Sequence, residues 1–277
     1  MSAGAIDGVR SITLTVKDLA KVRDFYVDVV GLRVLDEAAG VAHLGVDGAA
    51  LLELVADPAV TIGQPRFPGL FHTAFLLPSH ADLGAWLHFA AGRRYRLDGA
   101  ADHAVSDAVY LSDPEGNGIE IYADRPRETW PWKDGEVQFV NDPMDFEGIA
   151  GRAKAPWQGA PAGTIVGHVH LRVGELGAAR AFYGEVLGLP VTASHYSGAM
   201  FYGAGRYHHH LGTNIWASRG AGARPIGTTG LARVTFTAID APEPIAARAD
   251  KAGIPVERVD EGIVLADPWG TQVLVAA

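Results

Sequence analysis

The sequence "ITLTVKDLAKVRDFYVDVVGLRV" (12–34) returns in altered form as "VHLRVGELGAARAFYGEVLGLPV" (169–191). Both copies begin with alternating apolar residues, and this period of two predicts a strand. An acidic residue and a leucine follow, then a stretch with helical spacing, a Phe-Tyr pair and a Gly-Leu pair whose glycine suits a helix end. The repeat therefore predicts a unit in which a strand and a helix are followed by further strands.

Two more pairs of segments extend the repeat. The segment "GLFHTAFLLPSHADLGAWL" (69–87) parallels "GLARVTFTAIDAPEPIAAR" (230–248), and "YLSDPEGNGIEIYAD" (110–124) parallels "VLADPWGTQVLVAA" (264–277). In the second pair, Asp-Pro-x-Gly predicts a tight turn before a final strand. We therefore expect four units, each with a strand, a helix and three strands, at about 9–57, 69–125, 166–218 and 230–277.

These units cannot bury the apolar faces of their sheets alone, so they should pair. The sequence predicts the α+β class, with four βαβββ units pairing into two half-barrels that each surround a cavity suited to a ligand. Along the chain we expect a first domain at 9–125 and a second at 164–277. The segment 126–163 is rich in Pro, Gly and Trp and is predicted to connect them.

The composition excludes several classes of function. The 277 residues carry a formal net charge of -9, so a nucleic-acid partner is not expected. The absence of cysteine excludes disulfides, thiolate metal sites and cysteine nucleophiles. The N-terminal sequence lacks a signal-peptide pattern, and no apolar run approaches the roughly 20 residues that span a bilayer. We therefore expect a soluble cytoplasmic protein with no membrane partner.

Four segments follow one another along the chain and together form a specific pattern: "GLFHTAFLLP", "DHAVSDAVYLSDPEGNGIEIYADRPR", "GHVHLRV" and "YHHHLGTNIW". With them the sequence resembles the vicinal oxygen chelate superfamily of glyoxalases, bleomycin resistance proteins and extradiol dioxygenases. More narrowly, it resembles the two-domain bacterial catechol 2,3-dioxygenases over nearly the whole chain. The resemblance implies an Fe(II) cofactor, with Mn(II) as an alternative, and a catecholic small molecule and O2 as substrates. A homo-oligomer is also expected.

In this superfamily, as the resemblance implies, metal ligands lie on the first strand of a unit and near the end of its last strand. These positions hold His72 and Glu120 in the second unit and His168 in the third, whereas the fourth unit has Arg233 and Leu274. If units two and three share a sheet, their residues form a 2-His-1-carboxylate set, which leaves open metal positions for substrate and dioxygen.

The alternative pairing joins units one and two. It would combine Ser11, Glu53, His72 and Glu120, which resembles a glyoxalase site that has lost one ligand. We expect units two and three to pair because that arrangement gives a complete set. Units one and four would then form a second barrel without metal.

The three histidines of "YHHHLG" (207–212) are predicted to lie on a strand, where alternation turns either the middle one or the outer two toward the cavity. The resemblance implies that His209 is an acid–base residue beside the dioxygen position. It also implies that His103 and Tyr110 bind the substrate hydroxyls and help to deprotonate them. A surface position for the histidine cluster is the structural alternative. Further candidates for the substrate pocket are His170, His208, His210 and Asn214.

The first hypothesis is thus an extradiol ring-cleaving dioxygenase of aromatic catabolism. One alternative is a glyoxalase-like, metal-dependent isomerase or lyase, which would not consume oxygen. Another is a metal-free protein that binds an aromatic compound and confers resistance to it. The glycine-rich segment "SRGAGARPIG" (218–227) lacks the Lys-Ser/Thr end and the following helix of a phosphate-binding loop, so we expect a flexible loop there.

Overall fold

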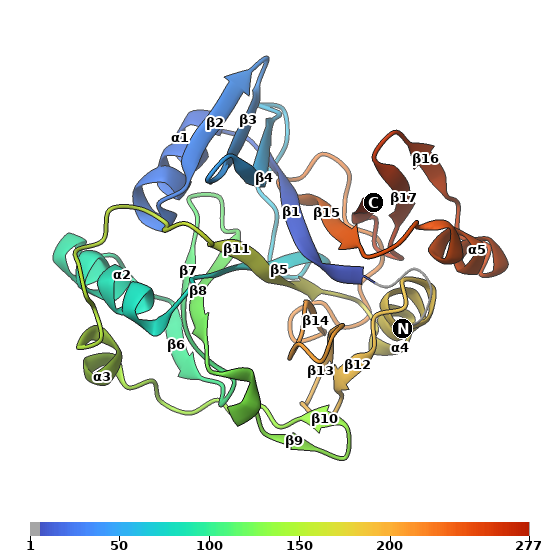
Figure 1. Ribbon diagram of the computed structural model, residues 1–277. Coiled ribbons are helices and arrows are strands. Elements are labelled where there is room, and N and C mark those ends of the chain that lie inside the picture. The colour runs from blue at the N-terminus through green and yellow to red at the C-terminus, as the bar shows by residue number, and fades with distance from the viewer. Residues whose placement is uncertain (1–5, 277) are drawn as a thin grey trace.

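The computed structural model describes residues 6–276, and its strands form two sheets of eight strands and one of two (Figure 1). Each large sheet joins two of the four units. Every unit consists of a strand, a helix and three strands, as the repeats predict. The α+β class and the two half-barrels are thereby confirmed.

The first large sheet joins units one and four, in the strand order β16-β17-β18-β15-β1-β4-β3-β2. The first strands of the two units, β1 and β15, pair antiparallel at its centre. Unit one contains β1 (Ile6–Val16), α1 (Leu19–Phe25) with a π-helical continuation (Tyr26–Val30), β2 (Arg33–Ala38), β3 (Val41–Val46) and β4 (Ala49–Ala56). Unit four contains β15 (Gly230–Ala238), α5 (Glu243–Lys251), β16 (Glu257–Val259), β17 (Gly262–Ala266) and β18 (Gln272–Ala276).

The second large sheet joins units three and two, in the order β12-β13-β14-β11-β5-β8-β7-β6, with β11 antiparallel to β5 at its centre. Unit two contains β5 (Gly69–Leu76), α2 (His80–Arg93), β6 (Gly99–Asp102), β7 (Ser106–Ser112) and β8 (Gly118–Asp124). Unit three contains β11 (Ile165–Arg172), α4 (Leu176–Ala179) with a π-helical continuation (Arg180–Val186), β12 (Val191–Ala193), β13 (Ala199–Tyr202) and β14 (Leu211–Asn214).

The pairing of unit two with unit three, and of one with four, is therefore confirmed. Each large sheet takes one unit from each half of the chain. The domain bounds 9–125 and 164–277 stay a prediction about how the chain divides.

The segment 126–163 runs along the second sheet (Figure 1). It contains a 3-10 turn (Arg127–Thr129), β9 (Trp132–Lys133), β10 (Glu136–Val137) and α3 (Phe146–Ala150). Trp130 is buried against the rings of Tyr207 and His208, and Glu136 accepts hydrogen bonds from the backbone and hydroxyl of Ser194. The connection is thus anchored on unit three. None of the helices described combines the length and apolar composition that crossing a bilayer requires.

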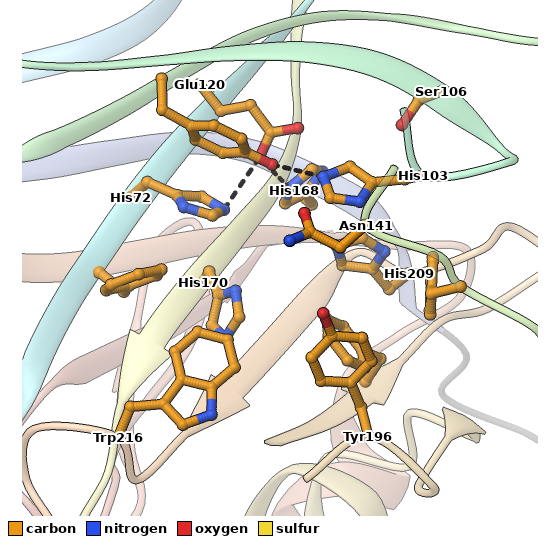
Figure 2. A pocket seen from close by; sticks show the side chains of 14 residues that line it. His72, His103, Ser106, Glu120, Asn141, His168, His170, Tyr196, His209 and Trp216 are labelled. Carbon is orange, nitrogen blue, oxygen red and sulfur yellow. Dashed lines mark hydrogen bonds and ion pairs between the residues drawn. The ribbon is translucent and has the colours of Figure 1, made fainter. Parts of the chain in front are cut away.

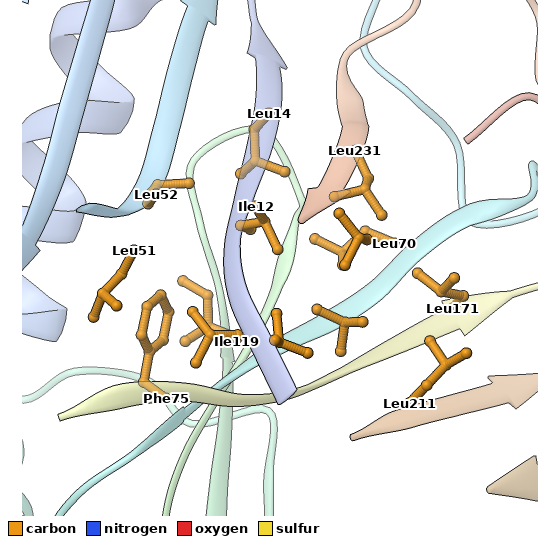
Figure 3. Close-up of a cluster of buried hydrophobic side chains, with 14 of the residues drawn as sticks. Ile12, Leu14, Leu51, Leu52, Leu70, Phe75, Ile119, Leu171, Leu211 and Leu231 are labelled. Atoms are coloured by element: carbon orange, nitrogen blue, oxygen red, sulfur yellow. The ribbon is translucent and has the colours of Figure 1, made fainter. Parts of the chain in front are cut away.

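The main core lies where β1 crosses over β5 and β11 (Figure 3). Its members are mostly aliphatic side chains from both sheets, among them Ile12, Leu14, Leu52, Leu70, Ile119, Leu171, Leu211 and Leu231, with Phe75 beside them. Because successive strand residues face opposite sides, these strands direct their apolar residues into the core and the intervening residues away from it. In the second sheet, the intervening residues include the histidines and Glu120.

Two repeated sequence motifs meet in buried hydrogen bonds between the sheets. The tyrosine of the Phe-Tyr pair donates to the aspartate of the Asp-Pro-x-Gly turn: Tyr183 Oη lies 2.8 Å from Asp267 Oδ2, and Tyr26 Oη lies 3.5 Å from Asp113 Oδ2. Asp267 also accepts the backbone N–H of Trp269. The sheets join units one with four and two with three, and these hydrogen bonds join one with two and three with four.

We predict that Tyr183→Phe lowers the free energy of unfolding by about 1.5–3 kcal/mol, because it leaves a buried carboxyl group without one of its donors. Urea unfolding followed by circular dichroism measures the change. Tyr26→Phe is the matched control and should cost less, since its hydrogen bond is long. Equal stability of Tyr183→Phe and the wild-type protein would contradict this role.

Candidate functional site

Three ligand-type side chains converge on the concave face of the second sheet. His72 of β5, Glu120 of β8 and His168 of β11 come from three adjacent strands and point toward one another (Figure 2). The Nε2 atoms of His72 and His168 lie 3.0 and 3.1 Å from Glu120 Oε2. One ligand atom from each residue lies within 4.8 Å of the others. The structure thus brings together the three residues that the sequence analysis selects.

These three residues could bind a metal ion. All are buried, and Glu120 is only 2% exposed. His72 Nε2 is close to Glu120 yet has no partner in hydrogen-bond geometry, so it is a buried polar atom left unsatisfied. A divalent cation would satisfy this nitrogen and balance the buried carboxylate, and two imidazoles with one carboxylate are a common donor set for such ions.

The protonation states of the cluster suit ligation. Burial alone would raise the pKa of Glu120, but the attraction and hydrogen bond of His168, together with the nearby His72, hold this pKa well below its usual range. Burial lowers the pKa of His168. An ionised carboxylate and a neutral imidazole are the forms that bind metal ions.

A chain of buried hydrogen bonds orients His168. Its Nδ1 lies 3.2 Å from the hydroxyl of Tyr122, which lies 2.9 Å from the hydroxyl of Tyr207, which donates to Asp124 Oδ2 at 2.8 Å. Because the carboxylate of Asp124 can only accept, the hydrogens run toward it and His168 Nδ1–H is a donor. The Nε2 atom is then the nitrogen that can ligate, which is how second-sphere groups fix a metal-binding histidine.

The histidine run is not a strand, so that part of the prediction is wrong: it lies in the loop between β13 and β14. Its middle member nevertheless faces the cavity. The rings of His209 and His168 have centroids 4.1 Å apart. His208 and His210 instead pack against Tyr207, at 4.2 and 4.7 Å between centroids.

His208 fixes the orientation of His209. Its Nε2 lies 2.9 Å from Asp124 Oδ1, and its Nδ1 lies 2.8 Å from His209 Nδ1. Since Asp124 accepts, the hydrogen of a neutral His208 is on Nε2, and its Nδ1 accepts from His209 Nδ1–H. This leaves the Nε2 lone pair of His209 free. Burial, reinforced by the neighbouring histidines, lowers the pKa of His209 well below its usual value, so the ring is neutral.

His103 and Tyr110 form a second hydrogen-bonded pair in the cavity. His103 Nδ1 lies 2.9 Å from the backbone oxygen of Val140, and its Nε2 lies 2.6 Å from the hydroxyl of Tyr110. The carbonyl accepts, so Nε2 of a neutral His103 accepts from the tyrosine hydroxyl. Burial and the charge of Glu120 raise the pKa of Tyr110 well above its usual value, so its hydroxyl keeps its proton.

A cavity of about 290 Å³ adjoins all of these groups. Predicted residues that line it are His72, His103, Tyr110, Glu120, His168, His170 and His209. The predicted pocket residues His208, His210 and Asn214 lie outside its lining. The residues that the sequence analysis missed are mostly aromatic: Phe71, Ser106, Phe139, Asn141, Tyr196, Phe201 and Trp216.

The missed residues make the cavity suited to a flat ring. Phe71 contacts the rings of His170 and Trp216 edge-on. Trp216, which is half-exposed, and Tyr196 lie on the side of the cavity away from Glu120 (Figure 2). His170 Nε2 is buried without a partner, so it is available to a bound molecule. Alternation along β5 would turn Phe71 away from His72, and the register shift between β5 and β11 next to His72 brings both to the cavity. Nothing in the sequence pattern indicates Asn141, which belongs to the connection.

Comparison with known proteins identifies the family of the chain. The family model described as the Glyoxalase/Bleomycin resistance protein/Dioxygenase superfamily matches residues 8–121 and 165–273. A catechol-2,3-dioxygenase of Bacillus subtilis is 38% identical over 263 residues, which cover 92% of this chain and 92% of the relative. A biphenyl-2,3-diol 1,2-dioxygenase of Rhodococcus globerulus is 28% identical over 137 residues, which cover 47% of this chain and 70% of that protein.

Solved structures share the fold at low identity. Glyoxalase I from Zea mays superposes with a TM-score of 0.59 at 17% identity, over 97% of this chain and 92% of that one. A Bacillus subtilis protein named provisionally as a dioxygenase superposes with a TM-score of 0.67 at 16% identity, over 99% of this chain and 86% of that one. These likenesses concern the fold alone.

We predict that Glu120→Gln weakens binding of a divalent transition metal more than 100-fold. Loss of a group that only hydrogen-bonds a metal ligand already lowers metal affinity about 10- to 100-fold. Glu120 would itself be a ligand, and it is the single carboxylate of this three-residue cluster. Metal analysis after equilibrium dialysis measures the affinity. Glu53→Gln, which changes the corresponding carboxylate of unit one, is the control and should retain the metal. Equal affinity in Glu120→Gln and the wild-type protein would exclude this site.

Proposed function

Because the chain belongs to the Glyoxalase/Bleomycin resistance protein/Dioxygenase superfamily, we propose that it is an extradiol dioxygenase that opens the ring of a catecholic substrate with O2. The observation that carries the proposal is a buried group of His72, Glu120 and His168 at one end of an aromatic-lined cavity. The similarity to a catechol-2,3-dioxygenase over most of the chain supports it.

The proposed cofactor is Fe(II), with Mn(II) as the alternative. Two imidazoles and one carboxylate on adjacent strands are the donor set of many non-haem ferrous oxygenases. When bound, the ion supplies a redox-active centre with open positions for the substrate oxygens and for O2. Cytoplasmic location and self-association stay predictions from the sequence.

The aromatic walls hold the substrate ring in this proposal. Phe71, Phe201 and Trp216 line the cavity and can contact a planar ring by edge or face while limiting access of water. The ring then lies with its hydroxyl groups toward Glu120. His170 Nε2 and the amide of Asn141 are polar groups that can bind substituents.

Two hydrogen-bonded pairs of side chains, Tyr110 with His103 and His209 with His208, can take part in proton transfer. The hydroxyl of Tyr110, which donates to His103, can accept a hydrogen bond from a substrate hydroxyl and help to orient its deprotonation. On another wall, His209 presents a free Nε2 that can take a proton and return it. His208 and Asp124 hold His209 in this tautomer, and so act as positioning residues.

We predict that the anaerobically Fe(II)-loaded protein takes up one O2 per catechol and forms a yellow ring-opened product, because ring cleavage incorporates both oxygen atoms. An oxygen electrode and visible absorption measure the two. Glu120→Gln should abolish the uptake and Glu53→Gln should retain it. Conversion of a substrate without oxygen uptake would instead support a glyoxalase-like reaction, and metal-independent binding without turnover would support a binding protein.

We predict that His209→Ala lowers kcat by about 10²- to 10⁴-fold, the usual contribution of an acid–base group. Metal content should stay at the wild-type level, since His209 is outside the ligand set. His210→Ala is the matched control: the neighbouring histidine is outside the cavity lining, and its loss should leave kcat within a few fold. Steady-state kinetics at saturating catechol measures kcat. An unchanged kcat in His209→Ala would exclude His209 as the acid–base residue.

A further inference from the structure

The two connections that join consecutive units run side by side. Residues 57–68 lead from unit one to unit two, and residues 215–229 lead from unit three to unit four. Thr61 exchanges backbone hydrogen bonds with this second connection, donating to Gly227 and accepting from Thr229, both at 2.9 Å. This junction lies outside the catalytic cavity.

Two arginines line a small cavity at this junction. Arg172 is the last residue of β11, and Arg224 belongs to the glycine-rich loop of the second connection. The cavity has a volume of about 20 Å³ and shares no lining residue with the 290 Å³ cavity. Its other polar side chains are Gln64, Glu115, Asn117 and Thr229.

Two glycines leave room for the side chain of Arg224. A Cβ atom at Gly230 would lie 3.2 Å from Arg224 Nη1, and one at Gly69 would lie 3.6 Å from it. Both glycines have positive φ, 122° and 133°, which other residues rarely adopt. The guanidinium group of Arg224 thus lies close to the glycines that begin β15 and β5.

Neither guanidinium group forms an ion pair within the described residues, although the charge of the buried Asp267 acts on Arg224. Every arginine ion pair within residues 6–276 involves Arg23, Arg125 or Arg233. The Nε atom of Arg172 donates to the backbone oxygen of Phe67 at 3.1 Å, and its two terminal nitrogens form no hydrogen bond in the described chain.

The carboxylate that lines the cavity is already engaged. Glu115 accepts the backbone N–H groups of Lys17 and Asp18 at 2.8–3.0 Å. Burial lowers the pKa of Arg172 to about 10, with no acidic group to offset it, so the side chain is still charged at neutral pH. Two partly buried guanidinium groups without an ion-pair partner leave positive charge at this cavity, which an anion can balance.

We propose that this cavity binds a small inorganic anion, of the size of chloride, between Arg172 and Arg224. About 10–15 Å³ is enough for one water molecule, so a cavity of about 20 Å³ matches one small ion. The unused N–H groups of both arginines are donors toward it, and the amide of Gln64 adds a polar partner. The anion ties the end of β11 to the second connection.

Thermal unfolding of the full chain at constant ionic strength tests the proposal, with chloride replacing gluconate, an anion too large for the cavity. The melting temperature should rise by a few degrees and saturate with chloride, as a ligand that binds only the folded state requires. Arg172→Met and Arg224→Met should each remove the dependence. Arg219→Met, which changes an exposed arginine of the same connection, should keep it.

Anomalous diffraction from wild-type crystals grown in bromide gives a second measurement that does not depend on whether the variants fold. A bromide peak between the two guanidinium groups is expected. The proposal is overturned if this position has no peak, or if the melting temperature is the same in chloride and gluconate. It is equally overturned if the arginine variants fold and keep the full chloride dependence.

Discussion

The antiparallel pairing of β11 with β5 is the contact on which the site depends. It places His168 opposite Ala74, and Ala74 is in turn paired with Glu120 on β8. The small side chain of Ala74 therefore separates the two ligand-type residues, and His72 lies two residues before it on the same strand face. A larger residue at this position would fill the space where the three side chains converge. A sheet made from either half of the chain alone could not form this row.

The outer support of the site also follows from strand alternation. Glu120, Tyr122 and Asp124 succeed one another at every second position of β8, so they share its concave face. Asp124 receives two hydrogen-bond chains, one from His168 through two tyrosines and one from His209 through His208. One partly exposed carboxylate thus fixes the tautomers of a candidate ligand and of a candidate base. Such support is what keeps a functional site preorganised.

The units could be predicted because a period of two marks their strands, and the ligand-type residues because they occupy the strand positions that the family resemblance implies. The histidine run shows the limit. Gly205 and Arg206 have φ of 58° and 57°, so the chain turns in the left-handed region and leaves the ladder before the histidines. Phe139 and Asn141 come from a connection without periodicity, and only long-range contacts place them in the cavity. Local pattern carries no information about either.

The first sheet has residues at the positions that correspond to His168, Ala74 and Glu120, but these residues differ in chemistry. There Arg233 of β15 is opposite Thr13, which is paired with Glu53 of β4. Arg233 Nη2 lies 3.7 Å from Glu53 Oε1, so the chain itself supplies a cation to this carboxylate. In the second sheet the corresponding position is His168, which is neutral in its ligating form, and Glu120 is far more deeply buried. A carboxylate that deep in the protein is costly without a positive charge beside it, and a bound metal ion would supply a permanent one here. At two corresponding strand positions the first sheet has Ser11 and Arg233 where the second has His72 and His168, so the first sheet neutralises its carboxylate internally and the second presents a set of ligand-type side chains.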